Sequence, residues 1–405
     1  MSDLNLTRLT AAVRKGGAAL VRKENLEPLG GFDVLVSPPT YSGGKYNYTA
    51  RTVDGETSAA VILDSKQSQL GRLEKAISNA PVGSVLNMIP RIAVTAPKSD
   101  NNPFEKRFTD IELPHRAYDG HIQLAKTLDD QGKSVYMTSH PKYIAIRNTA
   151  VSGAWELLNT APTSLVFGAW DSARKGGVQT RILSAITGDT YGVLADQRGG
   201  FYSETKRNYA RTDPFGPQYI PGEKVIKELY PLRADDPKAV PSKVKNKDSA
   251  AAIGVGNLIG ETKDLGLAGV CLSKIVRTTI LSLSTIRLLN FGDEVNSRAD
   301  KDDALTAIRA LLAAYALVAR TYADQNITLR AGCELIATSP SHWELVLEDG
   351  TVEQFDNLTV SEAESLLSEA LKAAEKFGVS WVGQVFDSEI NEKIGTPVSD
   401  DSESS

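Results

Sequence analysis

The spacing of apolar residues along the chain predicts several helices. The strongest pattern covers residues 308–323, where Leu311, Tyr315 and Val318 recur at intervals of four and three. Residues 360–377 repeat this period and carry an acidic face. Further helices are predicted at residues 1–28, 70–77, 155–158 and 178–186.

Runs of β-branched and aromatic residues predict strands between these helices. They cover residues 32–37, 58–63, 91–96, 142–146, 165–167, 191–195, 274–283, 327–336 and 343–347. Asp349-Gly350 then predicts a turn into a further strand at 351–355. This mixture of helices and strands predicts an α+β fold class.

The predicted strand 58–63 passes into a helix through the polar segment Asp64-Ser65-Lys66-Gln67-Ser68-Gln69-Leu70-Gly71-Arg72-Leu73-Glu74. Asp64 is a candidate N-cap, and a glutamine three residues later completes a capping-box pattern. Lys66, Gln69 and Arg72 share one side of the helix, where they could hold the phosphates and ribose of a nucleic acid. An ordinary amphipathic helix with a solvated polar face explains the same pattern.

A second polar segment reads Phe167-Gly168-Ala169-Trp170-Asp171-Ser172-Ala173-Arg174-Lys175-Gly176-Gly177 and precedes the predicted helix 178–186. Arg174, Lys175 and Arg181 supply positive charge, and the amides of Gly176 and Gly177 lie beside them, open to a close backbone approach. Trp170 either stacks on a nucleobase or fills the core. Two helix beginnings rich in cations therefore predict a channel that binds a phosphate polymer.

Composition is compatible with this prediction once the charge is mapped along the chain. The 405 residues are 41% hydrophobic and 23% charged, which fits one large elaborated domain or two smaller ones. Residues 293–405 hold 8 Lys and Arg against 22 Asp and Glu, a charge of −14. The net charge of −5 therefore leaves +9 for residues 1–292, a basic body that can bind nucleic acid.

The sequence lacks the residue patterns that several kinds of metal-binding and catalytic site need. The four histidines show no metal-ligand spacing, and Cys271 and Cys333 lie in apolar runs that favour buried free thiols. No Walker A loop and no G-x-S-x-G turn occurs. We therefore expect no metal, no cofactor and no catalytic residue. In the absence of an apolar leader or a bilayer-spanning run, we also expect a cytoplasmic protein without membrane contact.

Four segments resemble the motifs of one CRISPR-associated family. Residues 64–74 resemble its S-x-Q-S-x-x-x-R-L-E signature, and residues 167–177 resemble its F-G-x-W-D-S-x-R-K-G signature. Residues 111–116, which read I-E-L-P-H-R, and residues 276–289 are also similar to that family. The chain thus resembles the repeat-associated (RAMP-type) backbone subunit of the type I-G Cascade effector, formerly type I-U.

This resemblance implies a fold and a set of partners. The fold would be an RNA-recognition-motif (ferredoxin-like) core with large insertions, forming one elaborated domain over residues 1–397. Several copies would polymerise along one CRISPR guide RNA and present it to target DNA in antiviral defence, beside other effector-complex subunits. A thumb insertion is expected near 97–121, a mobile loop near 231–250, and a disordered acidic tail at 398–405.

Under this resemblance, further residues become candidates for nucleic-acid contact. The expected RNA-binding set is Lys45, Lys66, Gln69, Arg72, Arg147, Trp170, Arg174, Lys175, Gly176, Gly177 and Arg181. The expected thumb would present Lys106, Arg107, His115 and Arg116. A surface loop with scattered charge explains the thumb residues equally simply.

Two other functions stay open at this point. A metal-independent ribonuclease that processes repeat RNA would need a histidine with a second acid–base group, and His115 beside Arg116 is the best candidate. A protein-only scaffold would need neither group and would carry no RNA.

Overall fold

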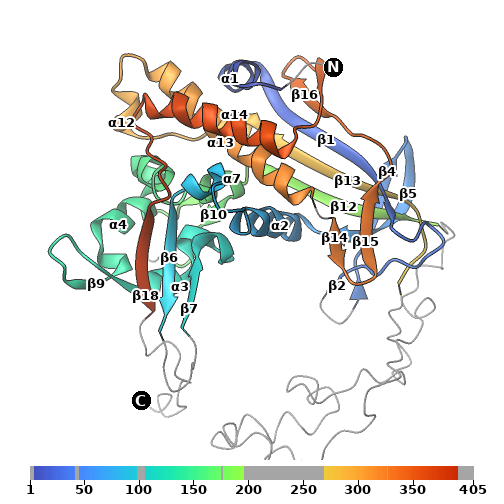
Figure 1. The fold of residues 1–405 in the computed structure, drawn as a ribbon, viewed down its shortest axis with the longest axis horizontal. Helices are drawn as coiled ribbons and strands as arrows, with labels where there is room; N and C mark the ends of the chain where they lie inside the picture. The colour runs from blue at the N-terminus through green and yellow to red at the C-terminus, as the bar shows by residue number, and fades with distance from the viewer. Residues whose placement is uncertain are drawn as a thin grey trace, which may run out of the picture.

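The computed structural model describes residues 4–41, 45–97, 105–174, 177–195, 269–325 and 327–390. The loop expected near 231–250 and the tail expected at 398–405 lie outside the described residues. The described chain has two large β-sheets and two short two-stranded ones, and Figure 1 shows helices packed between and beside the large sheets.

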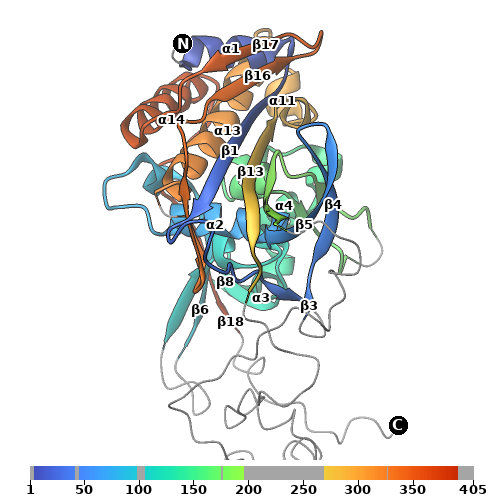
Figure 2. The ribbon, with the colours of Figure 1, turned by 90° about the vertical axis from the view of Figure 1, so that its right-hand side faces the viewer.

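The larger sheet is a curled antiparallel half-barrel, which faces the viewer in Figure 2. Its strands follow the order β14-β15-β1-β13-β12-β5-β4, and β16 and β17 extend it beside β1. The bounds are β1 Gly17–Pro28, β4 Tyr48–Val53, β5 Glu56–Asp64, β12 Ile186–Leu194, β13 Leu272–Ser282, β14 Thr328–Arg330, β15 Cys333–Ala337, β16 Trp343–Leu347 and β17 Val352–Phe355.

Apolar and polar side chains alternate along the central strands, so one face of this sheet packs against the core and the other faces solvent. Leu20 of β1 lies opposite Leu281 of β13, and both side chains are buried in the core. Lys23 lies opposite Thr278 on the other face, and Lys23 is exposed. A strand that is apolar on one face and polar on the other is typical of an antiparallel sheet with one solvated side.

Helix α13, Lys301–Ala323, forms the centre of the core. Helices α1 (Leu6–Arg14), α2 (Lys66–Ser78) and α14 (Val360–Glu375) pack against it. It is also the one described helix that is long and apolar enough to span a membrane. Since 89% of its apolar stretch is buried within the fold, its composition is explained by its place in the core.

The second sheet is smaller and takes strands from both halves of the chain. Its order is β7 (Lys106–Thr109), β6 (Arg91–Ala96), β18 (Val385–Ile390), β8 (Ala125–Leu128) and β9 (Ser134–Tyr136). Strand β18 runs parallel to β6 and antiparallel to β8. A segment that comes late in the chain therefore forms the middle of this sheet (Figure 1).

Short elements connect these layers. The two-residue strands pair as β2 (Thr40–Tyr41) with β3 (Lys45–Tyr46) and as β10 (Ala169–Trp170) with β11 (Arg181–Ile182). The remaining helices are α3 Gly120–Leu124, α4 Pro141–Arg147, α5 Thr149–Ser152, α6 Trp155–Leu158, α7 Thr163–Phe167, α11 Leu283–Arg287 and α12 Asp293–Asn296. The 3₁₀ turns are η1 Val85–Met88, η2 Asp110–Glu112, η3 Arg116–Tyr118 and η4 Met137–Ser139.

A buried cluster of ion pairs joins the larger sheet to α13. The carboxylate of Glu24 on β1 accepts hydrogen bonds from Arg22, Arg277 and Arg320 at 2.6–2.8 Å. Asp324, just after α13, accepts from Arg22 and Arg277. Burial alone would raise the pKa of Glu24, but the three guanidinium groups, Arg320 foremost, overcome it and hold the pKa at about 2.

The α+β prediction is confirmed, and so are several individual elements. The structure contains the predicted strands at 91–96 and 274–283, the hairpin of 343–347 with 351–355, and the helices at 155–158, 308–323 and 360–377, within a few residues. The RNA-recognition-motif core stays a prediction.

Other predicted elements are wrong. Residues 142–146 form helix α4 because Pro141 occupies its first turn and His140 caps it. Residues 165–167 belong to helix α7, and the predicted helix 178–186 is instead the strand β11 and the start of β12.

Three further segments and one cysteine also differ from expectation. Residues 1–28 split into the helix α1 and the strand β1, and residues 32–37 contribute only a single bridge, between Val36 and Val270. Residues 327–336 form a hairpin rather than one strand. Cys333 is buried as predicted, but Cys271 is exposed.

Candidate nucleic-acid interface

The first polar segment starts helix α2, although its cap is not the predicted residue. Ser65 is the N-cap, and its hydroxyl accepts a hydrogen bond from Ser68 N. Asp64 is the last residue of β5, and its carboxylate is almost fully buried. The prediction of Asp64 as N-cap is therefore wrong, because this carboxylate has an arginine partner instead.

Arg72 of α2 is that partner, and its guanidinium donates hydrogen bonds to three groups of the protein itself. Its Nε donates to Asp64 Oδ2 at 3.1 Å, and its two Nη atoms donate to the carbonyl oxygens of Thr328 and Leu329. Arg72 thereby ties the edge strand β14 to the end of β5. Its contact with RNA stays a prediction. In the structure, its positive charge pairs with the carboxylate of Asp64.

Gln69 and Lys66 have different surroundings even though they were predicted on one helix side. Gln69 is 4% exposed and lies against β12, where a Cβ at Gly188 would come within 2.3 Å of Gln69 Oε1. A Cβ there would also lie 2.0 Å from the carbonyl oxygen of Thr278, so the neighbouring strand and the Gln69 amide together require a glycine. Lys66, in contrast, is exposed.

One arginine joins the two polar segments. Arg116 donates through Nε to Glu74 on α2 and through Nη1 to the carbonyl of Gly168, at 2.8 Å. Its backbone has a φ of +51°, which is unusual for a residue with a side chain. Burial raises the pKa of Glu74, and the Arg116 guanidinium opposes that shift. Arg116, expected in the thumb, therefore brings the first segment to the second.

The second polar segment is a helix end followed by a hairpin, not a helix beginning. Gly168 ends α7 with a φ of +81°, and a Cβ there would lie 2.8 Å from Ser184 N. The chain then forms β10, where Trp170 lies opposite Arg181 of β11. The prediction of two helix beginnings is thus wrong for this segment, since its residues lead into strand pairing.

The β10–β11 hairpin displays an aromatic ring and a cation together. The Arg181 guanidinium lies 5.6 Å from the centre of the Trp170 ring, and Trp170 is 48% exposed. This geometry is that of a cation–π pair. Trp170 is thus half exposed, and both of the uses predicted for it stay open.

Other members of the second segment fix the local structure. Arg147 donates two hydrogen bonds to the fully buried Asp171, at 2.7 and 3.0 Å. The bond to Asp171 raises the pKa of Arg147. Arg174 donates to the carbonyl of Arg147 and to the side chain of Asn148. These contacts hold the end of α4 against the chain that follows β10 within the hairpin.

The remaining predicted RNA-binding residues are only partly described. Gly177 is exposed and lies near the Arg174 side chain. Lys45 lies in the strand β3. Lys175 and Gly176 lie outside the described residues.

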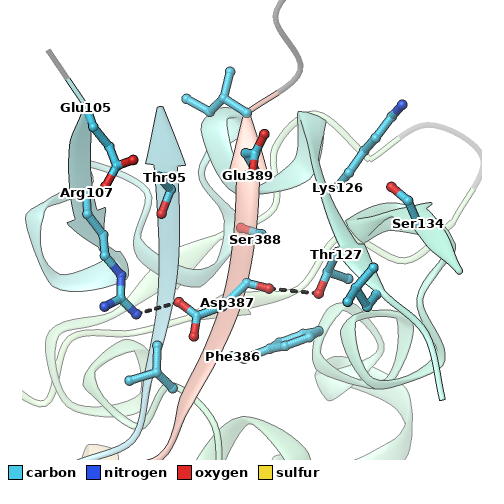
Figure 3. Close-up of a pocket in the computed structure, with 13 residues that line it drawn as sticks. Thr95, Glu105, Arg107, Lys126, Thr127, Ser134, Phe386, Asp387, Ser388 and Glu389 are labelled. Atoms are coloured by element: carbon cyan, nitrogen blue, oxygen red, sulfur yellow. Dashed lines mark hydrogen bonds and ion pairs between the residues drawn. The ribbon is translucent and has the colours of Figure 1, made fainter. Parts of the chain in front are cut away.

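The thumb stays a prediction, and the residues expected in it lie in several elements of the described chain. Lys106 and Arg107 lie on β7 of the second sheet, and Arg107 pairs with Asp387 of β18. Figure 3 shows this pair in a groove of about 990 Å³ across the sheet, where Thr127 Oγ1 donates to the carbonyl of Asp387 at 2.7 Å. His115 is exposed, and its backbone N–H donates to Asp119.

A histidine that was not singled out in the sequence has the closest carboxylate partner. His121 Nδ1 lies 2.7 Å from Asp119 Oδ1, and the His121 side chain is 54% exposed. Hydrogen bonds from His121 and from backbone N–H groups hold the pKa of Asp119 below its usual range, although partial burial opposes them. The D-x-H spacing was the available signal, but it is too short to be specific. Within the described residues, no group of three or more His, Cys, Asp or Glu side chains could hold a metal ion.

Comparisons with known proteins address the resemblance directly. No curated protein matches the chain. A family model described as CRISPR-associated protein GSU0053 matches residues 20–197, which include both polar segments, Arg116 and the β10–β11 hairpin. This match confirms the resemblance to a CRISPR-associated family and associates the chain with RNA-containing CRISPR effector complexes. Over residues 20–197, the chain is similar to this CRISPR-associated family, and this similarity supports a role in CRISPR defence.

Proposed function

We propose that this protein is a non-catalytic backbone subunit that binds CRISPR guide RNA and polymerises along it. The subunit would be of the RAMP type and would belong to a type I-G effector, where it presents the guide for pairing with target DNA. In such an arrangement, base pairing supplies the sequence specificity, and the protein contacts the backbone and the shape of the nucleic acid.

The observation that carries this proposal is the exposed Trp170–Arg181 pair within the matched family region. Single-stranded RNA is typically bound by aromatic rings that stack on bases and by cations that neutralise phosphates. Arg116 connects this hairpin to α2, whose Lys66 is exposed. The charge of +9 over residues 1–292 favours binding of a polyanion to this part of the molecule.

The first test is purification from the native host, followed by absorbance measurement and sequencing of bound nucleic acid. A guide-binding subunit should bring stoichiometric RNA with CRISPR repeat and spacer sequence. A protein-only scaffold should bring none, and that result would contradict the proposal.

The second test uses the Trp170 and Arg181 side chains. Trp170→Ala and Arg181→Ala should weaken RNA binding across unrelated sequences. Arg181→Ala should also reduce, by about 1, the slope of the logarithm of the binding constant against the logarithm of the salt concentration. A matched control exists on the second sheet, where Lys126 Nζ lies 5.1 Å from the ring centre of the exposed Tyr136. If Lys126→Ala and Tyr136→Ala weaken binding equally, the β10–β11 hairpin has no special role.

A metal-independent ribonuclease remains the second candidate, and the His121–Asp119 pair is the observation that favours it. A carboxylate beside a half-exposed histidine is one way to orient an acid–base catalyst. Repeat RNA should then be cleaved in EDTA, and His121→Ala should abolish cleavage more completely than His115→Ala. Intact RNA after prolonged incubation with the wild-type protein would exclude this candidate.

A further inference from the structure

A groove of about 720 Å³ runs between α2 and the segment 111–116. Its α2 wall includes Gln67, Gly71 and Lys75, which follow one another at intervals of four and therefore lie on one side of the helix. All three residues are exposed. The opposite wall includes Pro114, and Arg116 also lines the groove.

Gly71 has no explanation within the part of the fold that the structure describes. Glycine is among the least favourable residues in a helix interior, and Gly71 lies in the middle of α2. A Cβ at this position would meet no atom within 4 Å. The packing of the chain therefore allows any small side chain at residue 71. A glycine is expected there when an outside molecule must approach the helix backbone closely.

The charged groups of the groove favour an anionic ligand. The carboxylate of Glu74 is paired with Arg116, and that of Glu112 accepts from Thr109 N and Thr109 Oγ1. Both acids are thus occupied by internal donors. The exposed Lys75 is on the helix wall, where it can meet a phosphate.

The lining of the groove includes both polar and apolar groups, as a nucleotide site requires. Gln67, Ser78 and Asn79 offer amide and hydroxyl groups for ribose and base edges. Leu70 and Pro114 offer apolar surface on which a base can lie.

We infer that this groove binds one nucleotide of a single-stranded RNA, with the sugar-phosphate backbone passing over Gly71. This inference rests on the proposed function and adds a binding position that is distinct from the Trp170–Arg181 hairpin. Lys75 neutralises the phosphate, and the base lies toward Pro114.

The test compares two substitutions at residue 71 in the full-length protein. Gly71→Ala should raise the melting temperature by about 1–2 °C, because alanine favours the helix. Gly71→Leu should also fold, yet it should weaken the binding of a fluorescent 30-nucleotide single-stranded RNA at least about tenfold, a loss comparable to one stacked base. A protein that is at least as stable but binds RNA less tightly is the expected signature.

Gly120 provides the matched control, because a Cβ there also meets nothing within 4 Å and it begins the separate helix α3. Gly120→Ala should leave RNA affinity unchanged. Failure of the wild-type protein to bind any RNA would overturn the proposed function itself. Normal binding by both residue-71 variants would overturn only the groove assignment, as would a loss of self-association without a loss of RNA affinity.

Cross-linking locates the RNA independently of any substitution. RNA that contains 4-thiouridine should cross-link to peptides within residues 67–79 or 111–116. Cross-links confined to other parts of the chain would contradict the inference.

Discussion

At the residue scale, Glu24 has the most concentrated set of charged contacts in the described chain. Its carboxylate meets Arg22, Arg277 and Arg320 in a place that solvent does not reach. Removing one member of a buried ion cluster leaves its partners with uncompensated charge, which costs more than the pair itself contributes. Nothing in the sequence indicated this cluster, because its members come from three distant segments.

Glu24→Gln should lower the free energy of unfolding by about 3–5 kcal/mol in a urea titration, since three buried arginines lose their common partner. The Glu24 pKa of about 2 lies below the unfolded value, so its stabilisation is present above about pH 4.5 and is lost as the pH falls toward 2. Arg107→Ala breaks an exposed pair and should change stability by less than about 1 kcal/mol. Equal effects of the two substitutions would contradict this account.

Asp110 has the opposite pH dependence. Burial raises its pKa to about 6, although Arg91 and a hydrogen bond from Ile92 N act against the shift. A raised carboxyl pKa means that ionisation destabilises the fold as the pH rises from about 4 through 6.

Asp110→Asn keeps the acceptor for Ile92 N but cannot ionise. The variant should therefore be more stable than the wild type at pH 8, by up to about 3 kcal/mol, and the difference should vanish near pH 4. Thermal or urea unfolding across this pH range measures the effect. A difference that does not depend on pH would contradict the assigned pKa.

At the element scale, α2 shows which parts of the fold are readable from sequence. Its helical period was plain from Leu70, Leu73 and Ile77, and the buried positions follow it. The roles of its polar residues were not readable, because Gln69 is buried against β12 and Arg72 bonds to β14. Both partners lie more than a hundred residues away in sequence.

The wrongly predicted elements fail for two different reasons, one local and one that depends on strand pairing. The alternating Lys142–Ile146 run matches a strand, but Pro141 favours a helix start. Residues 178–186 show a helical spacing of apolar residues, yet Thr180 and Arg181 lie in a hairpin that closes on Ala169 and Trp170. Pairing between distant residues decided this case, and local periodicity cannot reveal it.

Substitutions of two cationic residues of α2 should separate effects on stability from effects on RNA binding. Arg72→Ala should lower stability by about 1–3 kcal/mol and expose the backbone of β14 to hydrogen exchange, because Asp64 and two carbonyls lose their donor. Lys66→Ala should leave the melting temperature unchanged and weaken RNA binding. Unchanged protection of residues 328–330 in Arg72→Ala would contradict the anchoring role.

At the scale of the whole molecule, late and early parts of the chain form one body. Trp381 is almost fully buried, and its indole N–H donates to the carbonyl of Leu158 at 2.9 Å. Its ring also packs against Tyr315 in α13. The charge asymmetry seen in the sequence therefore does not correspond to two separate folding units.

Trp381→Ala should destabilise the whole protein by about 3–5 kcal/mol, because it removes a buried ring and its hydrogen bond. Trp170→Ala offers a matched comparison, since that ring is half exposed and should contribute less than about 1 kcal/mol. Urea unfolding followed by circular dichroism measures both. A small effect at Trp381 would show that the late segment is dispensable for the core.

The position of β18 has a consequence for how the protein is made. Strands β6 and β8 emerge from the ribosome long before Val385–Ile390, the strand that both of them pair with. Until then, each keeps an unpaired edge of the kind that promotes aggregation or exchange between chains. A chaperone would matter most during this interval of synthesis.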